Sequence, residues 1–327
     1  MNTGEHSILV IRLGAMGDII HTLPAVASLK RSFPEWRLRW VVARKWAALL
    51  EGNPNVDEIV PFERSGISAL AGSWQRLRRA RPELAIDFQG LIQSALVGWV
   101  SRPKNYFGLD KSLARERLAA SFYTRRVVAK GPHRVERNLQ LAAAAGAGNL
   151  TMSSWLPQGR PEGQLPAGPF VLANPFAGWT SKQWPIASYE ALAERLKDQG
   201  VALVANVPPG REHELATLTH VRVHVSGIGG LIDATRRATA VVGVDSGPLH
   251  LAAALGKPGV SLFGPTDPAQ TGPFGSRMTV LRAQDAETTY KRDREIHASM
   301  KDLTVDQVAN ALIKSIAAAS PAAVHSS

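Results

Sequence analysis

The stretch SILVIRLGAMGDIIHTLP, residues 7–24, contains an apolar run, a loop with two glycines and the start of a helical pattern. The run at 7–13 is short and almost wholly apolar, which is typical of a strand buried on both faces of a parallel sheet. Gly14 and Gly17 permit a tight turn, and Asp18 falls where a helix begins. A strand, a loop and a helix in this order predict one unit of an α/β sheet.

Similar apolar runs alternate with helical patterns along the rest of the chain. This alternation favours parallel sheets with helices on both faces. The other predicted strands are residues 37–43, 84–89, 170–175, 201–207, 221–227, 240–245 and 259–264. The predicted helices are residues 18–34, 68–80, 135–147, 188–200, 231–239 and 247–256.

A segment rich in proline and glycine, LPQGRPEGQLPAGP at 156–169, divides the chain into nearly equal halves. This composition is typical of a linker. We therefore predict an N-terminal domain over residues 1–160 and a second domain over residues 161–303, with similar α/β sheets facing a ligand-binding cleft. A last helix is predicted over residues 304–320, with Thr304 as its N-cap.

The composition restricts the chemistry and the partners. The chain has 327 residues, a formal net charge of +11 and no cysteine, so disulfides, thiolate nucleophiles and cysteine-bound metals are excluded. No His, Asp or Glu group has metal-ligand spacing. Basic clusters at 76–82, 114–126 and 133–138 favour a compact anionic ligand over nucleic acid, because no RNA-binding or helix-turn-helix motif accompanies them. A basic surface without a specific partner is the alternative.

Targeting and membrane-spanning signals are not apparent. The N-terminus lacks the basic segment and apolar core of a signal peptide. The longest nearly apolar stretch, GLIQSALVGWV at 90–100, is too short to span a bilayer. We therefore expect a cytoplasmic protein.

Asp18 allows two interpretations. From its position alone, a carboxylate that caps a helix is favoured over a catalytic base. The spacing of Gly14 and Gly17 does not match a dinucleotide-binding loop. Gly227, Gly229 and the later Asp245 approach that pattern more closely, but Ile232 stands where the third glycine is required, so a dinucleotide site is disfavoured.

The stretch VGVDSGPLHLAAALGKP, residues 242–258, predicts an anion site. A buried strand ends at Asp245, and Ser246–Gly247–Pro248 opens a helix whose free N–H groups would bind a phosphate. His250 follows one turn after Ser246. The alternative is that Asp245 and Ser246 only cap the helix and that His250 is a buried structural histidine.

Two further loops follow predicted strands of the second half. In NPFAGWTSKQWP, residues 174–185, the ammonium of Lys182 suits a diphosphate, although a solvated lysine fits equally. In FGPTDP, residues 263–268, Thr266 and Asp267 would face the same edge of the sheet. No G-x-S-x-G or Walker motif occurs, which disfavours nucleophilic hydrolases and P-loop kinases.

Taken together, seven segments resemble the lipopolysaccharide heptosyltransferases of glycosyltransferase family 9. They are GAMGDIIHTLPAV, DFQGLIQSAL, ARERLAASFY, HRVERN, SKQWP, GVDSGPLHLAAAL and FGPTDP, in this order along the chain. ARERLAASFY and HRVERN are most similar to the heptosyltransferase I branch, which adds the first heptose to the Kdo of the inner core. The resemblance implies a GT-B fold of two Rossmann-like domains, with the C-terminal helix crossing back to pack on the N-terminal domain.

The resemblance also implies an inverting transfer from ADP-heptose, bound by the second domain, to a Kdo-lipid A acceptor, bound by the first, without an obligatory metal. Asp18 would be the general base and Lys182 would hold the diphosphate. The other donor-binding residues would be Thr180, Ser181, Glu212, Asp245, Ser246, Gly247 and His250, with Glu214 as an alternative to Glu212 at the ribose. The acceptor-binding residues would be Arg12, Gly17, Arg115, His133 and Arg137.

The sequence departs from the family pattern in two places, and two alternative functions are open. Ala177–Gly178 stand where hydroxyl residues are expected, and Arg64 is the only base in 61–74, which would suit a less phosphorylated acceptor. One alternative is a relative that uses another nucleotide sugar or adds a later core heptose. The other is a non-catalytic module that binds anionic glycolipids. We expect a monomer with transient electrostatic contact to the inner membrane.

Overall fold

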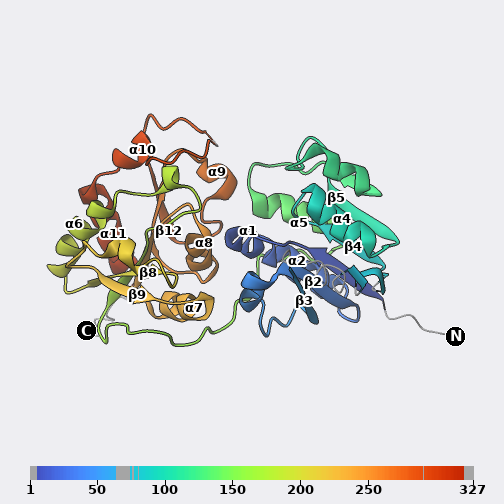
Figure 1. The fold of residues 1–327 in the computed structure, drawn as a ribbon, viewed down its shortest axis with the longest axis horizontal. Helices are drawn as coiled ribbons and strands as arrows, with labels where there is room; N and C mark the ends of the chain where they lie inside the picture. The colour runs from blue at the N-terminus through green and yellow to red at the C-terminus, as the bar shows by residue number, and fades with distance from the viewer. Residues whose placement is uncertain (1–5, 64–73, 76, 80, 290, 320–327) are drawn as a thin grey trace, which may run out of the picture. The chain divides into compact units, whose positions relative to one another are not determined.

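The computed structural model describes residues 6–63, 74–75, 77–79, 81–289 and 291–319 (Figure 1). Contacts divide the chain into two compact units, Met1–Pro157 and Gln158–Ser327. The division falls inside the predicted linker at 156–169. Arg64 and most of the predicted helix at 68–80 lie outside the described residues.

The first unit contains a fully parallel sheet in the order β3-β2-β1-β4-β5-β6. The chain moves to one side after β1 and returns to the other side of β1 to form β4. The carboxyl ends of these two neighbouring strands therefore form the point at which the strand order reverses. The strands are β1 (Ser7–Ile11), β2 (Arg37–Ala43), β3 (Glu58–Phe62), β4 (Leu84–Asp87), β5 (Asn105–Leu109) and β6 (Arg125–Val127).

The second unit repeats this topology. Its parallel sheet has the order β12-β11-β10-β7-β8-β9, so β7 and β10 take the places of β1 and β4. The prediction of two Rossmann-like α/β domains is therefore confirmed. The strands are β7 (Phe170–Asn174), β8 (Ala202–Val207), β9 (Arg222–Val225), β10 (Ala240–Val244), β11 (Gly259–Phe263) and β12 (Met278–Arg282).

The single helix predicted over 18–34 is wrong. The chain forms two helices there, and His21–Thr22 form a turn between them, although both residues keep right-handed helical backbone angles. Pro24 explains the break, because proline lacks an N–H and is tolerated in the first turn of a helix but not in its interior. The helical segments of the first unit are α1 (Met16–Ile20), α2 (Leu23–Ser32), η1 (Arg44–Leu49), α4 (Ile92–Val100), η2 (Arg117–Phe122) and α5 (Arg134–Ala144).

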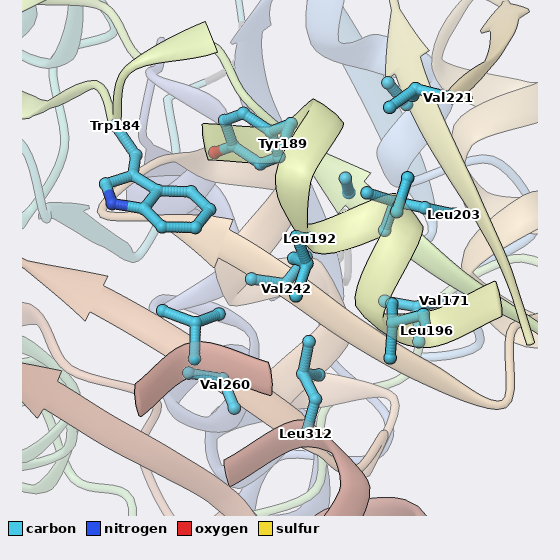
Figure 2. Packing of buried hydrophobic residues seen from close by; sticks show 14 of the residues in the cluster. Val171, Trp184, Tyr189, Leu192, Leu196, Leu203, Val221, Val242, Val260 and Leu312 are labelled. Carbon is cyan, nitrogen blue, oxygen red and sulfur yellow. The ribbon is translucent and has the colours of Figure 1, made fainter. Parts of the chain in front are cut away.

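The helices of the second unit surround its core, which Figure 2 shows. Trp184 and Tyr189 are fully buried and pack edge-to-face with ring centroids 5.1 Å apart. The indole N–H of Trp184 donates to the carbonyl of Leu303 at 2.9 Å, which satisfies its polar atom inside the core. The helical segments are η3 (Thr180–Lys182), α6 (Ile186–Lys197), η4 (Glu212–Leu215), α7 (Ile228–Arg237), α8 (Gly247–Ala254), α9 (Pro268–Thr271), α10 (Ala298–Lys301) and α11 (Val305–Ala319).

The C-terminal helix α11 packs on α6 and on strands β10, β11 and β12. Val308 and Leu312 are fully buried in the core of the second unit. The apolar stripe of this helix therefore covers the sheet of its own unit. Packing of the helix on the N-terminal domain stays a prediction. The predicted cap is present: Thr304 Oγ1 accepts from the N–H of Gln307 at 3.3 Å, and Gln307 Oε1 accepts from the N–H of Thr304 at 3.0 Å.

Candidate active site

Two polar clusters lie at the reversal points of the two sheets. Asp18 follows β1 and Gln89 follows β4, while Lys182 follows β7 and Asp245 follows β10. Open α/β sheets bind ligands at the carboxyl ends of the strands where the strand order reverses. Each unit therefore carries a candidate binding site at the same topological position.

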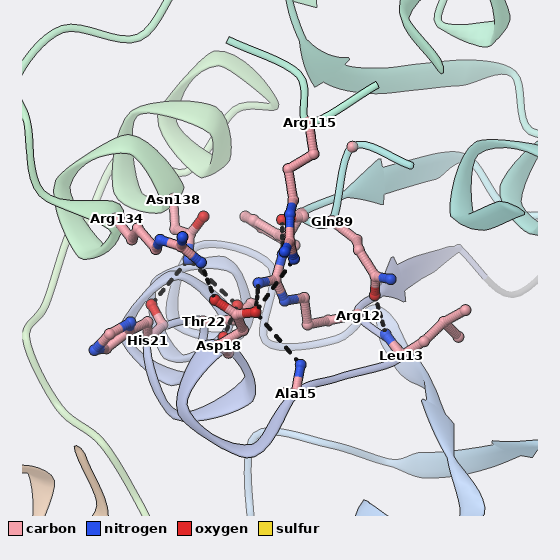
Figure 3. Close-up of polar contacts among 12 residues, drawn as sticks. Arg12, Leu13, Ala15, Asp18, His21, Thr22, Gln89, Arg115, Arg134 and Asn138 are labelled. Atoms are coloured by element: carbon pink, nitrogen blue, oxygen red, sulfur yellow. Dashed lines mark hydrogen bonds and ion pairs between the residues drawn. The ribbon is translucent and has the colours of Figure 1, made fainter. Parts of the chain in front are cut away.

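In the first cluster, three arginines converge on the carboxylate of Asp18 from different parts of the chain (Figure 3). Arg134 Nη1 lies 2.5 Å from Oδ1, and Arg12 Nη2 lies 2.7 Å from Oδ2. Arg115 Nη1 lies 3.6 Å from Oδ2. The backbone N–H of Ala15 lies 3.4 Å from the same oxygen, so Asp18 is chiefly an ion-pair partner and only weakly a helix cap.

The charge state of Asp18 follows from these contacts. Burial raises the pKa of Asp18, but the charges of Arg12, Arg134 and Arg115 together lower it more, so the pKa lies below its usual range. The carboxylate is ionised at neutral pH and can accept a proton. It becomes a stronger base when an arginine leaves it, because each arginine favours the charged form.

The three arginines differ in how firmly they are held. The Arg12 side chain is only 5% exposed, and its Nη1 donates to the carbonyl of Phe88. The side chains of Arg115 and Arg134 are 46% and 36% exposed. An anionic ligand can therefore reach Arg115 and Arg134, whereas Arg12 is a fixed partner of Asp18.

A buried network holds the loop that supports Arg12. Asp87, at the end of β4, is fully buried and accepts from Tyr123 Oη at 2.7 Å and from Ser94 Oγ at 2.8 Å. It also accepts from the N–H of Gln89 at 2.8 Å. Gln89 Oε1 in turn accepts from the N–H of Leu13 at 2.8 Å. These bonds fix the loop after β4 against the loop after β1.

The structure brings only part of the expected acceptor set to Asp18. Arg12 and Arg115 contact it, and Gly17 is the buried second residue of α1. His133 is the N-cap of α5, where its Nδ1 accepts from the N–H of Val135 at 3.1 Å. Arg137 lies outside the cluster, and its Nε donates to the carbonyl of Gly131 at 2.9 Å.

Arg134 is the residue of this cluster that the sequence analysis missed. It stands in HRVERN between the two residues that were selected. Because α5 begins at Arg134, residues 134 and 138 share one helix face. Asn138 Nδ2 donates to the carbonyl of His21 at 3.0 Å, which fixes this face against α1. Had His133 been recognised as the N-cap of this helix, Arg134 would have been the expected ligand-binding residue of the segment.

An open cavity of about 660 Å³ lies beside the cluster. It is lined by the Leu13–Ala15 loop, Arg44, Lys45, Trp46 and Arg115, among others. A Cβ at Gly14 would lie 2.9 Å from the indole nitrogen of Trp46, so glycine permits their close approach. The basic side chains suit an anionic sugar, although Arg44 also pairs with Glu63.

In the second cluster, Lys182 Nζ donates to the backbone carbonyl of Asp245 at 2.6 Å and to its Oδ2 at 3.1 Å. His250 Nε2 lies 3.4 Å from Asp245 Oδ1. Burial raises the pKa of Asp245, but its hydrogen bond with His250 and the charge of Lys182 lower it more, so the pKa lies below its usual range. An ammonium has three N–H donors, so Lys182 retains one for a phosphate oxygen.

Buried polar atoms without partners gather at the same edge of the second sheet. The hydroxyls of Ser181, Ser246 and Thr266 and the side-chain amide of Asn174 have no hydrogen-bond partner among the described residues. Asn174 is the last residue of β7, and the three hydroxyl residues follow β7, β10 and β11. Buried polar groups are normally hydrogen-bonded, so a polar ligand fits this edge. Ser246 is the N-cap of α8 and Gly247 its first residue.

The remaining expected donor residues lie on short helical turns. Thr180 is half-buried at the start of η3. Glu214 is paired with Arg211, whose Nη2 lies 2.8 Å from Oε2. Glu212 is exposed at the start of η4. Glu212 is therefore the more accessible of the two carboxylates for a ribose.

Comparisons with known proteins now identify the family. The model of glycosyltransferase family 9 (heptosyltransferase) matches residues 71–301. The chain belongs to glycosyltransferase family 9. This family 9 glycosyltransferase is 34% identical over 303 residues to lipopolysaccharide heptosyltransferase 1 of Pseudomonas aeruginosa, which covers 84% of this chain and 83% of that protein.

Two solved structures support the same assignment. The Escherichia coli heptosyltransferase WaaC with ADP has a TM-score of 0.76 and 26% identity, and covers 93% of this chain and 98% of its own. Escherichia coli ADP-heptose lps heptosyltransferase II has a TM-score of 0.77 and 25% identity, and covers 95% of this chain and 99% of its own. The expected GT-B fold and glycosyltransferase class are confirmed.

Two features of the structure bear on metals and membranes. Among the described residues, no group of three or more His, Asp or Glu side chains is placed to hold a metal ion. None of the helices within that part of the chain has both the length and the apolar character needed to cross a bilayer.

Proposed function

We propose that this family 9 enzyme transfers L-glycero-D-manno-heptose from ADP-heptose to the Kdo of the lipopolysaccharide inner core, with inversion at the anomeric carbon. The observation that carries the proposal is the ionised Asp18 with two accessible arginines beside it. A base next to cations suits an acceptor that carries both a hydroxyl and a carboxylate. The similarity to heptosyltransferase 1 of Pseudomonas aeruginosa supports the first-heptose role.

In the proposed reaction, the acceptor oxygen attacks the anomeric carbon while the bond from that carbon to the ADP oxygen breaks. The hydroxyl proton passes to Asp18, and the bonding electron pair leaves with ADP. Charge therefore develops on the diphosphate, where the remaining N–H of Lys182 and the start of α8 at Ser246–Gly247 stabilise it. We propose that this electrostatic stabilisation makes a metal ion unnecessary.

The acceptor itself strengthens the base in this mechanism. Its Kdo carboxylate competes with Asp18 for Arg115 and Arg134, which are the exposed members of the cluster. When these cations pair with the acceptor, the carboxylate of Asp18 loses part of its stabilisation and binds a proton more readily. Arg12 remains in place because its side chain is buried and bonded to Phe88.

A transfer assay with ADP-heptose and Kdo-bearing lipid A tests the proposal directly. The expected product is heavier by one heptose, with the anomeric configuration opposite to that of the donor, and it forms equally well with EDTA present. In the control reactions, UDP-sugars or GDP-sugars replace ADP-heptose as the donor. Transfer from one of these donors, with none from ADP-heptose, would contradict the donor assignment.

Addition of a later heptose is the second candidate, because the structural similarity to heptosyltransferase II is nearly the same as that to WaaC. An acceptor that already carries one heptose separates the two candidates. The first-heptose proposal predicts transfer only to the Kdo-terminated acceptor.

A further inference from the structure

We propose that Trp74, Trp99 and Phe122, together with Arg78 and Arg102, form a docking site for an anionic phospholipid bilayer. We call these five residues the aromatic–arginine site. The proposal adds a membrane-contact surface to the proposed function, but its evidence and its test do not require the transfer reaction.

The site surrounds a cavity of about 500 Å³ where α4 ends and β5 begins. Trp99, on the last turn of α4, is 56% exposed. Its ring packs edge-on against Phe122 with centroids 6.3 Å apart. Trp74 lines the same cavity. A large aromatic side chain is thus held in place by a neighbour while most of its surface remains accessible.

Further exposed apolar side chains lie on the same elements. Ile92 is exposed on α4, and it shares a face with Trp99 because the two are seven residues apart. Leu118 is 67% exposed on η2, which packs against α4. Single exposed apolar residues are ordinary on a protein surface, but a cluster of them marks an interaction site.

The charge around the cavity is of one sign. Arg78 and Arg102 line it, and no Asp or Glu is among the lining residues that the structure describes. Neither arginine forms an ion pair with an acidic residue in the described part of the chain. Both guanidinium groups are therefore available to phosphates, which they bind with paired hydrogen bonds.

Arg102 occupies a backbone position that does not suit arginine. It follows the C-cap Ser101 with φ +52°, in the left-handed region where helices usually place glycine. A non-glycine residue in this conformation costs free energy. Glycine at this position would keep the backbone conformation and remove only the guanidinium, which makes Arg102→Gly a clean test of the charge.

Aromatic and basic side chains together indicate a membrane surface. Tryptophan is enriched at the interface of bilayers because its ring is apolar and its N–H is polar. Arginine near the surface adds attraction to anionic lipids. A nucleic acid would use the same charges, but exposed Ile92 and Leu118 add apolar surface that favours an acyl layer.

The test measures binding of the full chain to vesicles without substrate. Vesicles of phosphatidylcholine with phosphatidylglycerol should bind the protein, and vesicles of phosphatidylcholine alone should bind it weakly. Brominated lipids should quench tryptophan fluorescence in the wild type and much less in the Trp74→Phe/Trp99→Phe variant. Binding should fall as salt is raised.

Variants separate the site from general effects. Trp99→Ser should weaken vesicle binding by at least about tenfold, since burial of a large apolar side chain contributes at least ~1.5 kcal/mol. Arg102→Gly should weaken vesicle binding about fivefold, because a basic residue near the membrane surface contributes ~1 kcal/mol. The thermal stability of this variant should be equal to or higher than that of the wild type. Leu150→Ser and Arg31→Gln, at exposed positions outside the site, should bind like the wild type.

Three results would overturn the proposal. The first is equal binding by wild type and Trp99→Ser. The second is self-association of the wild type, lost in Trp99→Ser, without vesicle binding, which would mean that a second copy covers the site. The third is stronger binding to RNA than to anionic vesicles. Because no assay here uses ADP-heptose, failure of the proposed transfer would leave these results unaffected.

Discussion

Asp18 has contacts that a helix cap does not require. Two of its oxygen contacts to arginine are shorter than 3 Å, while its contact to the backbone of Ala15 is 3.4 Å. Its position at a helix start was evident from the sequence. The arginines were harder to assign, because Arg115 and Arg134 come from segments that only the fold brings to Asp18.

Replacement of Asp18 by Asn should reduce transfer by about 10²–10⁴-fold, since a positioned base contributes that much. ADP binding should be unchanged, because the donor cluster lies in the second unit. Transfer rates and calorimetric ADP titration check this. Asp57→Asn is the control, because Asp57 also pairs with a cation, Lys30, at 2.8 Å. Equal activity of the two variants would refute the assignment.

Arg134 and Arg137 provide a matched pair on α5. Arg134 contacts Asp18, while Arg137 donates to the backbone carbonyl of Gly131. Arg134→Gln should raise the KM for the acceptor about tenfold or more, as expected for loss of a hydrogen bond to a charged group. Arg137→Gln should change it little. Steady-state kinetics with varied acceptor concentration measure these KM values. A larger rise in KM for Arg137→Gln than for Arg134→Gln would contradict the assignment of Arg134 to acceptor binding.

Stability should depend on pH through Asp18. Its pKa is lowered in the folded state, so its contribution is fully present above the unfolded pKa of about 3.9 and is lost as the pH falls below that value. In urea unfolding between pH 7 and pH 3, the free energy of unfolding should therefore decrease less with falling pH in Asp18→Asn than in the wild type. Parallel curves would contradict the ion-pair account.

At the scale of elements, the central strands of both sheets could be predicted, whereas β3, β5, β6 and β12 were not. The strands β1, β7, β10 and β11 are buried at every residue and consist mainly of apolar residues. In contrast, β6 has three residues, β3 contains Pro61, and β12 is half-exposed. Strands with one covered face or a short length give a weak apolar signal. The division between the units was visible because proline and glycine mark the linker.

The buried network around Asp87, which holds the loop next to Arg12, can be tested by a substitution at Gly108 on β5. A Cβ there would lie 2.2 Å from the ring of Tyr123, whose hydroxyl donates to Asp87. Gly108→Ala should lower the free energy of unfolding by ~1–3 kcal/mol, as overpacking does. Urea unfolding measures it. Gly148→Ala is the control, since a Cβ there meets nothing within 4 Å, and equal stability of the two variants would argue against the clash.

For the whole molecule, the assignment of ADP to the second unit has a measurable effect. A ligand stabilises the unit that binds it by RT ln(1 + [L]/Kd), about 2.7 kcal/mol at 100-fold excess over Kd. Hydrogen exchange with ADP should therefore slow in β7 and β10 more than in β1 and β4. Lys182→Ala should reduce this protection. Equal slowing in both sheets would oppose a donor site confined to the second unit.

The shared strand order of the two sheets has an evolutionary consequence. Each half presents its own loops at its own reversal point, and the residues assigned to the acceptor and to the donor occupy different halves. Under the proposed assignments, mutations after β1, after β4 or at the start of α5 should change which glycan is glycosylated without disturbing recognition of the activated sugar. Such modularity would allow one scaffold to diversify into enzymes that build successive residues of a surface polysaccharide.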